Sequence, residues 1–449
     1  MSAHALADAV SFYDGLLRGE VLERTHETLL RQCEARTVRH KGRSLYRVLR
    51  PRFITPEQQA DLQRASRAVS QALETVYRRA CEDEAFRRLL GIQDWEELLM
   101  PMDASCQISG RLDGFTGPDG VIRFIEYNPD PGGPLHMHNI GEAFAATPVL
   151  EAFARRYEVS FPRTAPPLIE SLKALHAGTG RSGVPQLAFF GPPSPDDGEE
   201  EALYRDYMRA QGLPIRLVTS EDAWTYRDGR LFVEDFQVDV VSYITSSGFA
   251  GLIVGCDREH PVMRALAERA AHFMNGLFRS CVLRNKLLFA VLSDVAHSEM
   301  FAPELRPVLA RHVPWTRAVK EGKTSYGGRE VELLPFIAEH REQLVLKPAN
   351  EFGGSGVTLG WQTDAATWST TLKTAVEGPW IVQERVPTAQ ERYPVYDGGQ
   401  LRHEELYADL NPFLWNDGRQ EGFCVRLSRD AIVNVAQGGC NTPLVVVQP

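Results

Sequence analysis

Apolar side chains recur at helical spacing through much of the first hundred residues. The pattern is clearest in one run, made of Leu62, Ala65, Val69, Leu73, Val76 and Ala80. Before it stand Thr55 as a capping residue, Pro56 at the first helical position and Gln58 three residues after the cap. A further helical stretch is expected over 81–90. We therefore expect residues 1–100 to form a helical region with a packing role.

The period changes to two between residues 108 and 128. Residues 111–115 and 121–128 alternate as strands do, and a turn-rich link, Thr116 to Gly120, lies between them. This pattern predicts a β-hairpin. Along its second strand, alternation assigns Phe124, Glu126 and Asn128 to one face, and Ile125 and Tyr127 to the other. Asp113 on the first strand is then close to the polar face.

Strands and helices alternate in the middle of the chain. We expect strands at 185–190, 214–218 and 238–243, with a helix at 199–210, which is the pattern of a parallel α/β unit. The loop between the first strand and the helix, Gly191 to Gly198, lacks G-x-G-x-x-G, so we expect a second substrate there rather than a dinucleotide. Residues 260–297 are helical in pattern.

The last segment predicts another hairpin, with strands at 422–428 and 432–435. Its first strand would turn Phe423, Val425 and Leu427 one way and Cys424, Arg426 and Ser428 the other.

Composition narrows the class of partner. The 449 residues are too many for one compact core and indicate two or three domains. A net charge of −10 argues against a broad nucleic-acid surface, and no apolar run approaches the length that spans a membrane. The seven cysteines are scattered and contain no C-x-x-C pair, as expected for reduced thiols in cytoplasm. A small molecule is the expected partner.

One segment has the character of a nucleotide site. Lys347 ends a predicted strand at 343–346, and Gly353, Gly354, Ser355 and Gly356 follow before strand character resumes at 357–359. The lysine supplies charge for a polyphosphate, while glycines let backbone N–H groups approach its oxygens. The order differs from a P-loop, in which the lysine follows the glycines. The alternative is an ordinary hairpin turn.

The predicted hairpin at 108–128 carries candidate metal ligands. Asp113, Glu126 and Asn128 offer the carboxylate and amide oxygens that Mg²⁺ prefers. Arg111 points the same way as Asp113 and is a candidate to neutralise a transferring phosphoryl group. The alternative is a solvated polar face.

Other candidates have competing interpretations. His136 and His138, taken as neighbours on a strand, would share a metal or else have a structural or substrate-contacting role, which the missing third ligand favours. Lys286 is either a surface lysine or a second phosphate ligand. The strand at 381–384 is either an adenine-contacting strand or a core strand.

Together these motifs resemble the circularly permuted ATP-grasp ligases of the glutathionylspermidine-synthetase-like type. The resemblance covers residues 105–449, and its motifs occur in the same order. They are Arg111/Asp113, Glu126/Asn128, Asn285/Lys286, Lys347 to Gly356, Gln383 to Val386, and the closing Arg426/Ser428, Asn434/Val435 and Gly438/Gly439. In the usual ATP-grasp order the metal-binding strands come after the nucleotide-binding lysines, whereas here they come before.

The resemblance implies a fold and a set of site residues. The fold is α+β or α/β: an N-terminal helical region (1–100), a metal-binding hairpin part (101–165), a Rossmann-like substrate domain (166–275) and a nucleotide-binding part (276–449). ATP would be bound by Lys286, Lys347, Gly353, Gly354, Ser355, Gly356, Gln383, Glu384, Arg385 and Val386. Asp113, Glu126 and Asn128 would hold Mg²⁺, and Arg111 would be catalytic.

The expected function is an ATP- and Mg²⁺-dependent carboxylate–amine ligase that forms an amide through an acyl phosphate and releases ADP. An ATP-dependent small-molecule kinase and a catalytically silent nucleotide-binding protein are the alternatives. The expected partners are a small carboxylate and a small amine.

Overall fold

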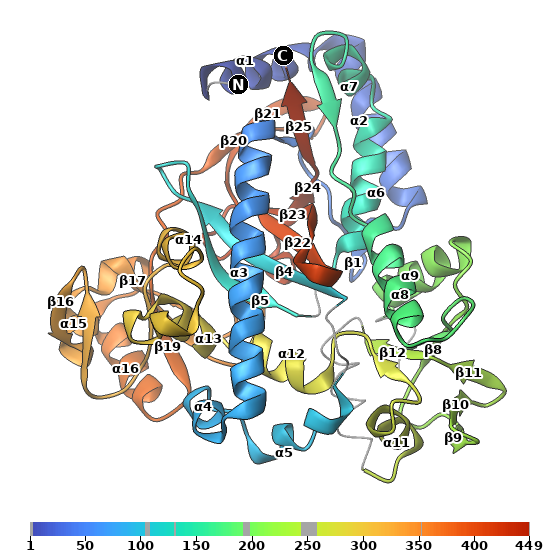
Figure 1. The fold of residues 1–449 in the computed structure, drawn as a ribbon. Helices are drawn as coiled ribbons and strands as arrows, with labels where there is room; N and C mark the ends of the chain where they lie inside the picture. Colours follow the sequence, from blue (N-terminus) through green and yellow to red (C-terminus); the bar gives the residue numbers. More distant parts are fainter. Residues whose placement is uncertain are drawn as a thin grey trace.

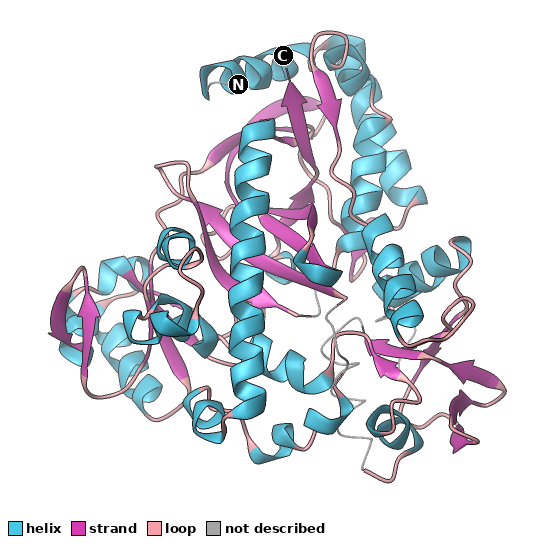
Figure 2. Cartoon of the chain, viewed as in Figure 1, coloured by secondary structure: helices cyan, strands magenta, loops and turns pink. Residues whose placement is uncertain are grey.

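A computed structural model describes residues 3–103, 108–129, 132–191, 198–243, 258–351 and 353–448 of the chain. A long helix crosses the front of a central antiparallel sheet, and two further lobes flank it (Figure 1). Figure 2 shows that the lobes on both sides mix helices with strands.

The central sheet has the strand order β20-β21-β23-β22-β4-β5, with β24 also paired to β23. Its strands are β4 (Ser109–Thr116), β5 (Ile122–Asn128), β20 (Glu391–Asp397), β21 (Gln400–Ala408), β22 (Asn411–Trp415), β23 (Gln420–Ser428) and β24 (Cys440–Thr442). The predicted hairpin at 108–128 is β4 paired with β5, and strands β20 to β24 complete the same sheet. Segments far apart in sequence therefore meet at β4.

The long helix α3 (Pro56–Glu82) begins with the predicted capping box. Thr55 Oγ1 accepts the N–H of Gln58, and the Gln58 side chain accepts the N–H of Thr55. Its apolar side packs against β22, β23 and β25. Other helices of this region are α1 (Ala3–Leu16), α2 (Gly19–Ala35), α4 (Glu84–Leu89) and α5 (Asp94–Glu97).

The first hundred residues are not purely helical. They also contain β1 (Arg39–His40), β2 (Arg43–Ser44) and β3 (Arg52–Ile54). Strand β3 runs parallel to the C-terminal β25 (Leu444–Gln448), whose other neighbour is β6 (Glu158–Ser160). Strands of two or three residues are too short to show an alternating pattern, so the sequence predicted only the helices.

The expected parallel α/β unit is confirmed. Strands β7 (Leu187–Phe190), β8 (Ile215–Val218), β12 (Val240–Tyr243) and β13 (His272–Phe273) form a parallel sheet in the order β13-β12-β7-β8. Near it lie α8 (Pro166–Gly178), α9 (Glu199–Ala210), α11 (Pro261–Ala267) and the meander β9 (Trp224–Arg227), β10 (Arg230–Val233), β11 (Phe236–Val238). Helix α6 (Pro134–Ala145) instead packs against β23 and β24, and α7 (Pro148–Phe153) packs against α1 and α2.

The remaining lobe carries Lys347. Its sheet runs β14-β19-β17-β18, and a small separate core lies beneath it. The elements of the lobe are α13 (Leu287–Ser293), β14 (Thr316–Ala318), β15 (Lys323–Tyr326), β16 (Arg329–Glu332), α15 (Leu333–Glu339), β17 (Leu344–Pro348), β18 (Thr358–Leu359), α16 (Ala365–Val376) and β19 (Trp380–Glu384). Helices α12 (Leu277–Arg284) and α14 (Arg306–His312) pack against α3 and β5.

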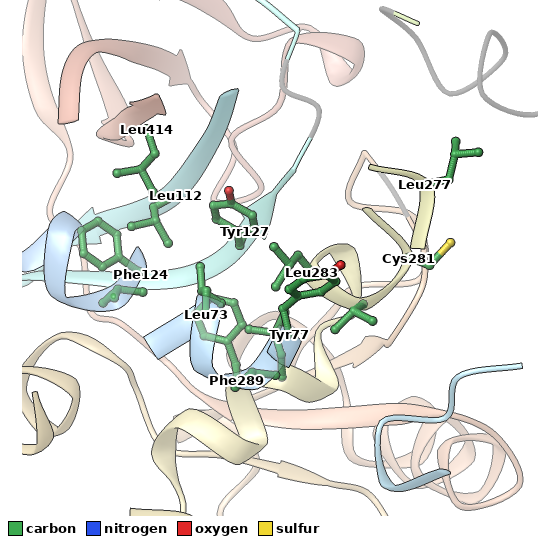
Figure 3. Packing of buried hydrophobic residues seen from close by; sticks show 14 of the residues in the cluster. Leu73, Tyr77, Leu112, Phe124, Tyr127, Leu277, Cys281, Leu283, Phe289 and Leu414 are labelled. Carbon is green, nitrogen blue, oxygen red and sulfur yellow. The ribbon is translucent and has the colours of Figure 1, made fainter. Parts of the chain in front are cut away.

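A β-bulge corrects the predicted faces of β5. Asp113 pairs with Glu126, but Gly114 pairs with Phe124, so Ile125 is an extra residue on this strand. Phe124 and Tyr127 consequently both join the core with Leu112 and, from α3, Leu73 (Figure 3). Glu126 and Asn128 do not share a face with Phe124, as strict alternation had predicted.

Two other predictions are wrong. Residues 432–435 do not form a strand beside β23, because β22, β21 and β24 already pair along it. His136 and His138 lie on helix α6 rather than on a strand, where side chains two residues apart do not face each other. This excludes the less favoured alternative, in which both histidines share one metal, and leaves the favoured structural or substrate-contacting role as a prediction.

The cysteines and the helices give two further facts. The five cysteines in the described part of the chain, Cys33, Cys81, Cys281, Cys424 and Cys440, are free thiols. In that same part, every helix is too short or too polar to cross a membrane.

Candidate functional site

Two arginines and two aspartates form a buried ion-pair network on the central sheet. Asp113 accepts Nε–H and Nη2–H of Arg111 at 2.5 and 3.0 Å, and its Oδ2 also accepts Nη2–H of Arg426 at 2.8 Å. Arg426 in turn donates from Nε to Oδ2 of Asp409 at 2.6 Å. The pairs hold both guanidinium planes in fixed orientations.

Burial and charge act in opposite directions on these carboxyls. Burial alone would raise the pKa of Asp113, but Arg111 and Arg426 outweigh it and hold that pKa below its ordinary value. For Asp409, burial is the stronger effect and raises the pKa, although Arg426 opposes it. Asp113 is therefore the firmly ionised member of the network.

Glu126 and Asn128 lie beside this network and are half-buried. Asp113 and Glu126 are paired residues on β4 and β5, as are Arg111 and Asn128. Asn128 Nδ2 lies 3.4 Å from Glu126 Oε1. In the described residues, no group of three or more His, Cys, Asp or Glu side chains is arranged to hold a metal. The oxygens available to a metal are thus those of the Glu126 carboxylate and the Asn128 amide, with the Asp113 carboxylate beside them.

Both predicted lysines reach the same place from the neighbouring lobe. Lys286 is 8% exposed, and its Nζ lies 3.6 Å from Glu126 Oε2 and 2.6 Å from the Glu351 carbonyl oxygen. This burial excludes the interpretation of Lys286 as a surface lysine. The backbone N–H of Lys286 donates to the Ala349 carbonyl, which ties it to the strand that carries Lys347.

Lys347 is buried, at 5% exposure, and the pKa of its side chain is lowered. Burial, reinforced by the charge of Lys286, lowers its pKa to about 8, although Glu126 and Asp113 oppose the shift. Its Nζ donates to Gln383 Oε1 at 2.7 Å. Gln383, 1% exposed, also donates to Thr316 Oγ1, so its amide orients the lysine.

The glycine loop has the conformation that its residues allow. Gly353, Gly354 and Gly356 all have positive φ, at 65°, 79° and 70°. A Cβ on Gly356 would stand 2.6 Å from Cγ of Pro348, so this position needs glycine for space as well. Ser355 is exposed on the same turn. The loop leads directly into β18.

A cavity of about 130 Å³ opens between the central sheet and the lobe of β17. Asp113, Glu126, Asp409 and Arg426 line it from the central sheet, and Lys347, Gly354 and Gln383 to Val386 line it from the lobe of β17. Arg385 lies over the Trp361 ring at 4.1 Å. Most predicted residues thus surround one space, while Gly353, Ser355, Gly356, Lys286, Arg111 and Asn128 do not line it.

The sequence did not identify Asp409 as a site residue. Asp409 is 1% exposed, and it also accepts the backbone N–H of Arg426 at 2.7 Å. The alternation on 422–428 turned Arg426 away from Phe423, Val425 and Leu427, and it does face the network. Asp409 follows β21 directly, and a buried acid next to a strand end was the only signal available.

Neither His136 nor His138 lines the cavity at Lys347. His136 is buried on α6, with Nδ1 3.8 Å from Glu200 Oε1, and His138 packs against Tyr207. Residues 192–197 of the predicted second-substrate loop lie outside the described part of the chain.

Comparison with known proteins supports the fold. No protein-family model matches the chain. It is 24% identical over 293 residues to "Putative glutamate–cysteine ligase 2-2" of Frankia casuarinae, which covers 61% of this chain and 31% of the relative. The chain spans about a third of that relative's length.

The chain also superposes on the structure of a glutathione synthetase-like effector, GSS30, from Globodera pallida. The TM-score is 0.60 at 13% identity, over 95% of this chain and 96% of that one. The chain therefore has a mixed α/β fold like that of a glutathione synthetase-like protein.

Proposed function

We propose that the protein is an ATP- and Mg²⁺-dependent ligase that joins a carboxylate to an amine and releases ADP and phosphate. The proposal includes an ATP-grasp fold in circularly permuted order, with the four-part division 1–100, 101–165, 166–275 and 276–449. The observation that carries it is the meeting of Lys286 and Lys347 with Glu126 across the cleft between the central sheet and the lobe of β17.

The charge balance of the site suits a polyphosphate. Four cationic side chains, Lys286, Lys347, Arg111 and Arg426, stand among three carboxylates, Asp113, Glu126 and Asp409. The cationic side chains can neutralise phosphate oxygens. The glycines at positive φ let backbone N–H groups approach the same oxygens. In the proposal, Gln383 to Val386 contact the nucleotide base.

Mg²⁺ fits the oxygen donors of Glu126 and Asn128. When bound, it would neutralise charge on the phosphate oxygens. Asp113 was expected to be a third ligand, but both of its oxygens accept hydrogen bonds from arginine. We therefore assign Asp113 to the orientation of Arg111 and Arg426, and the metal to Glu126 and Asn128.

The chemistry follows from the poor leaving group of a carboxylate. A carboxylate oxygen of the substrate attacks the γ-phosphorus of ATP, and ADP leaves. The amine nitrogen then attacks the acyl carbon, its proton is lost, and phosphate leaves. Arg111 and Arg426 stabilise the charge on the transferring phosphoryl group, and the glycine loop excludes water that would hydrolyse the acyl phosphate.

The names of the similar proteins guide the choice of substrates. One is named a glutamate–cysteine ligase and the other glutathione synthetase-like. We therefore propose amino acids or short peptides as both the carboxylate and the amine.

A coupled assay of ADP release tests the proposal. Amino acids and glutamate-containing peptides are screened in pairs with ATP and Mg²⁺, and products are weighed by mass spectrometry. The proposal expects ADP release that needs both members of a pair, with a product lighter than their sum by one water. A phosphorylated product formed from one member alone would instead identify a kinase, and the absence of both turnover and nucleotide binding would reject the proposal.

A further inference from the structure

A second cavity, of about 600 Å³, lies at the start of α3 and shares no lining residue with the cavity at Lys347. Segments distant in sequence form its wall: α1, the first turns of α3, the β4–β5 turn, α14 and β20. Its volume is that of a small-molecule site. Neither the proposed reaction nor the comparisons assign it a role.

The wall of this cavity is apolar in part. Val10, Val121 and Val308 are each half-buried there, from α1, the β4–β5 turn and α14. Apolar side chains that converge from three separate elements on one hollow provide a surface for the hydrocarbon part of a ligand.

Four arginines line the cavity, and two of them remain able to bind an anion. Arg50 is paired with Asp14, and Arg52 with Glu391 at 2.6 Å. Arg64 is paired only with Asp61, three residues away on the same exposed face, and such pairs are weak. The side chain of Arg311 makes no hydrogen bond or ion pair with any other described residue, and it lines the cavity next to His312. His312 is itself engaged, through Nδ1, with the Ile122 carbonyl at 2.8 Å.

The cavity also has a connection to the candidate site. Arg52 Nη1 donates to the Asp409 carbonyl oxygen at 3.1 Å, and the Asp409 carboxylate holds Arg426. Arg52 on the wall of this cavity is therefore linked through Asp409 to the arginine network.

We propose that this cavity binds a small organic carboxylate, with its apolar body against Val10, Val121 and Val308 and its charge held by Arg311 and Arg64. The proposal does not depend on the ligase activity. It requires only the geometry of the wall and the guanidinium groups at its rim.

The test uses 1-anilinonaphthalene-8-sulfonate, which joins an apolar ring system to one negative charge and fluoresces when bound. We expect one saturable site, displaced by hexanoate but not by hexylamine. Arg311→Ala should weaken binding roughly tenfold, the usual effect of losing a charge-assisted hydrogen bond. Val308→Trp, which fills the hollow, should abolish it.

The matched control is Arg306→Ala, on the same helix but outside the cavity. It should leave binding unchanged. Arg311 is exposed, so its replacement leaves the fold intact even if Val308→Trp fails to fold. Equal affinity of the Arg311→Ala and native proteins, or equal displacement by hexylamine and hexanoate, would overturn the proposal.

Discussion

Arg426 on β23 donates a hydrogen bond to Asp113 on β4, with Nη2 and Oδ2 2.8 Å apart although 313 residues separate them in the chain. The same guanidinium is held by Asp409 on its other side, at 2.6 Å. Asp113 also orients Arg111, so one carboxylate sets the position of both arginines at the site. In the proposed function, the two acidic residues therefore have different roles: Asp113 orients the arginines, and Glu126 holds Mg²⁺.

The two roles predict different defects. Glu126→Gln should remove most of the gain in nucleotide affinity that Mg²⁺ provides, roughly tenfold or more for one ionic contact. Asp113→Asn should keep that gain but lose turnover, because the arginines are no longer held. Calorimetric titration of a non-hydrolysable ATP analogue with and without Mg²⁺ measures the gain in affinity, and the assay of ADP release measures turnover. Asp119→Asn, an exposed carboxylate of the same hairpin, is the control and should match the native protein.

Asp409 should be important for stability. Its replacement by alanine leaves a buried guanidinium with one partner fewer, which costs about 3 kcal/mol in the free energy of unfolding. Urea denaturation followed by circular dichroism measures the change. The control is Asp61→Ala, whose exposed pair with Arg64 should contribute less than about 1 kcal/mol. Similar costs for the two variants would show that the buried network stabilises the fold no more than an exposed ion pair does.

Lys347 predicts a pH dependence of nucleotide binding. Because its pKa is lowered to about 8, the free protein loses this charge as the pH rises from 7 to 9. Affinity for the ATP analogue should therefore fall roughly tenfold over that range. Lys347→Met should bind weakly at pH 7 and show no such fall. An equally steep decline in this variant would assign the titration to another group.

The same lowered pKa has the opposite effect on stability. Between pH 8 and about 10.4 the unfolded chain binds more protons at this position than the folded chain does. The free energy of unfolding of the native protein, relative to Lys347→Met, should therefore rise with pH in that window. Parallel denaturation curves of the two proteins at pH 7.5 and 10 measure the difference.

The glycine loop offers a pair of substitutions that separates strain from crowding. Gly353→Ala and Gly356→Ala both place a side chain at positive φ, which costs about 1 kcal/mol. Only at Gly356 does the new Cβ meet Pro348 at 2.6 Å, whereas Gly353 is open. We expect a larger loss of nucleotide affinity for Gly356→Ala. Equal losses would show that the loop moves away from Pro348 when nucleotide binds.

Local patterns predicted those parts of the fold that local interactions determine. The capping box at Thr55, the β4–β5 hairpin and the β7–α9–β8 unit depend on neighbouring residues and were predicted correctly. The bulge at Ile125 was not, because it depends on the pairing between two strands rather than on one strand's alternation. The apolar pair Ile432 and Val433 indicated a strand, but these residues line the cavity at Lys347 instead.

For the candidate site, too, the motifs along the chain were predicted and the contacts between distant strands were not. The resemblance supplied residues that lie close together, including Lys286 and Lys347 near Glu126. The role of Asp113 as partner of two arginines and the contribution of Asp409 required the packing of β23 between β22 and β21. No spacing along the chain contains that information.

The most direct test of the proposed ligase is the fate of carboxylate oxygen. Amino-acid carboxylates labelled with ¹⁸O are incubated with ATP, Mg²⁺ and amine acceptors, and the released phosphate is analysed by mass spectrometry. Activation through an acyl phosphate predicts one ¹⁸O atom in the phosphate for each amide formed. Amide formation with unlabelled phosphate, or no label in phosphate with any acceptor, would contradict it.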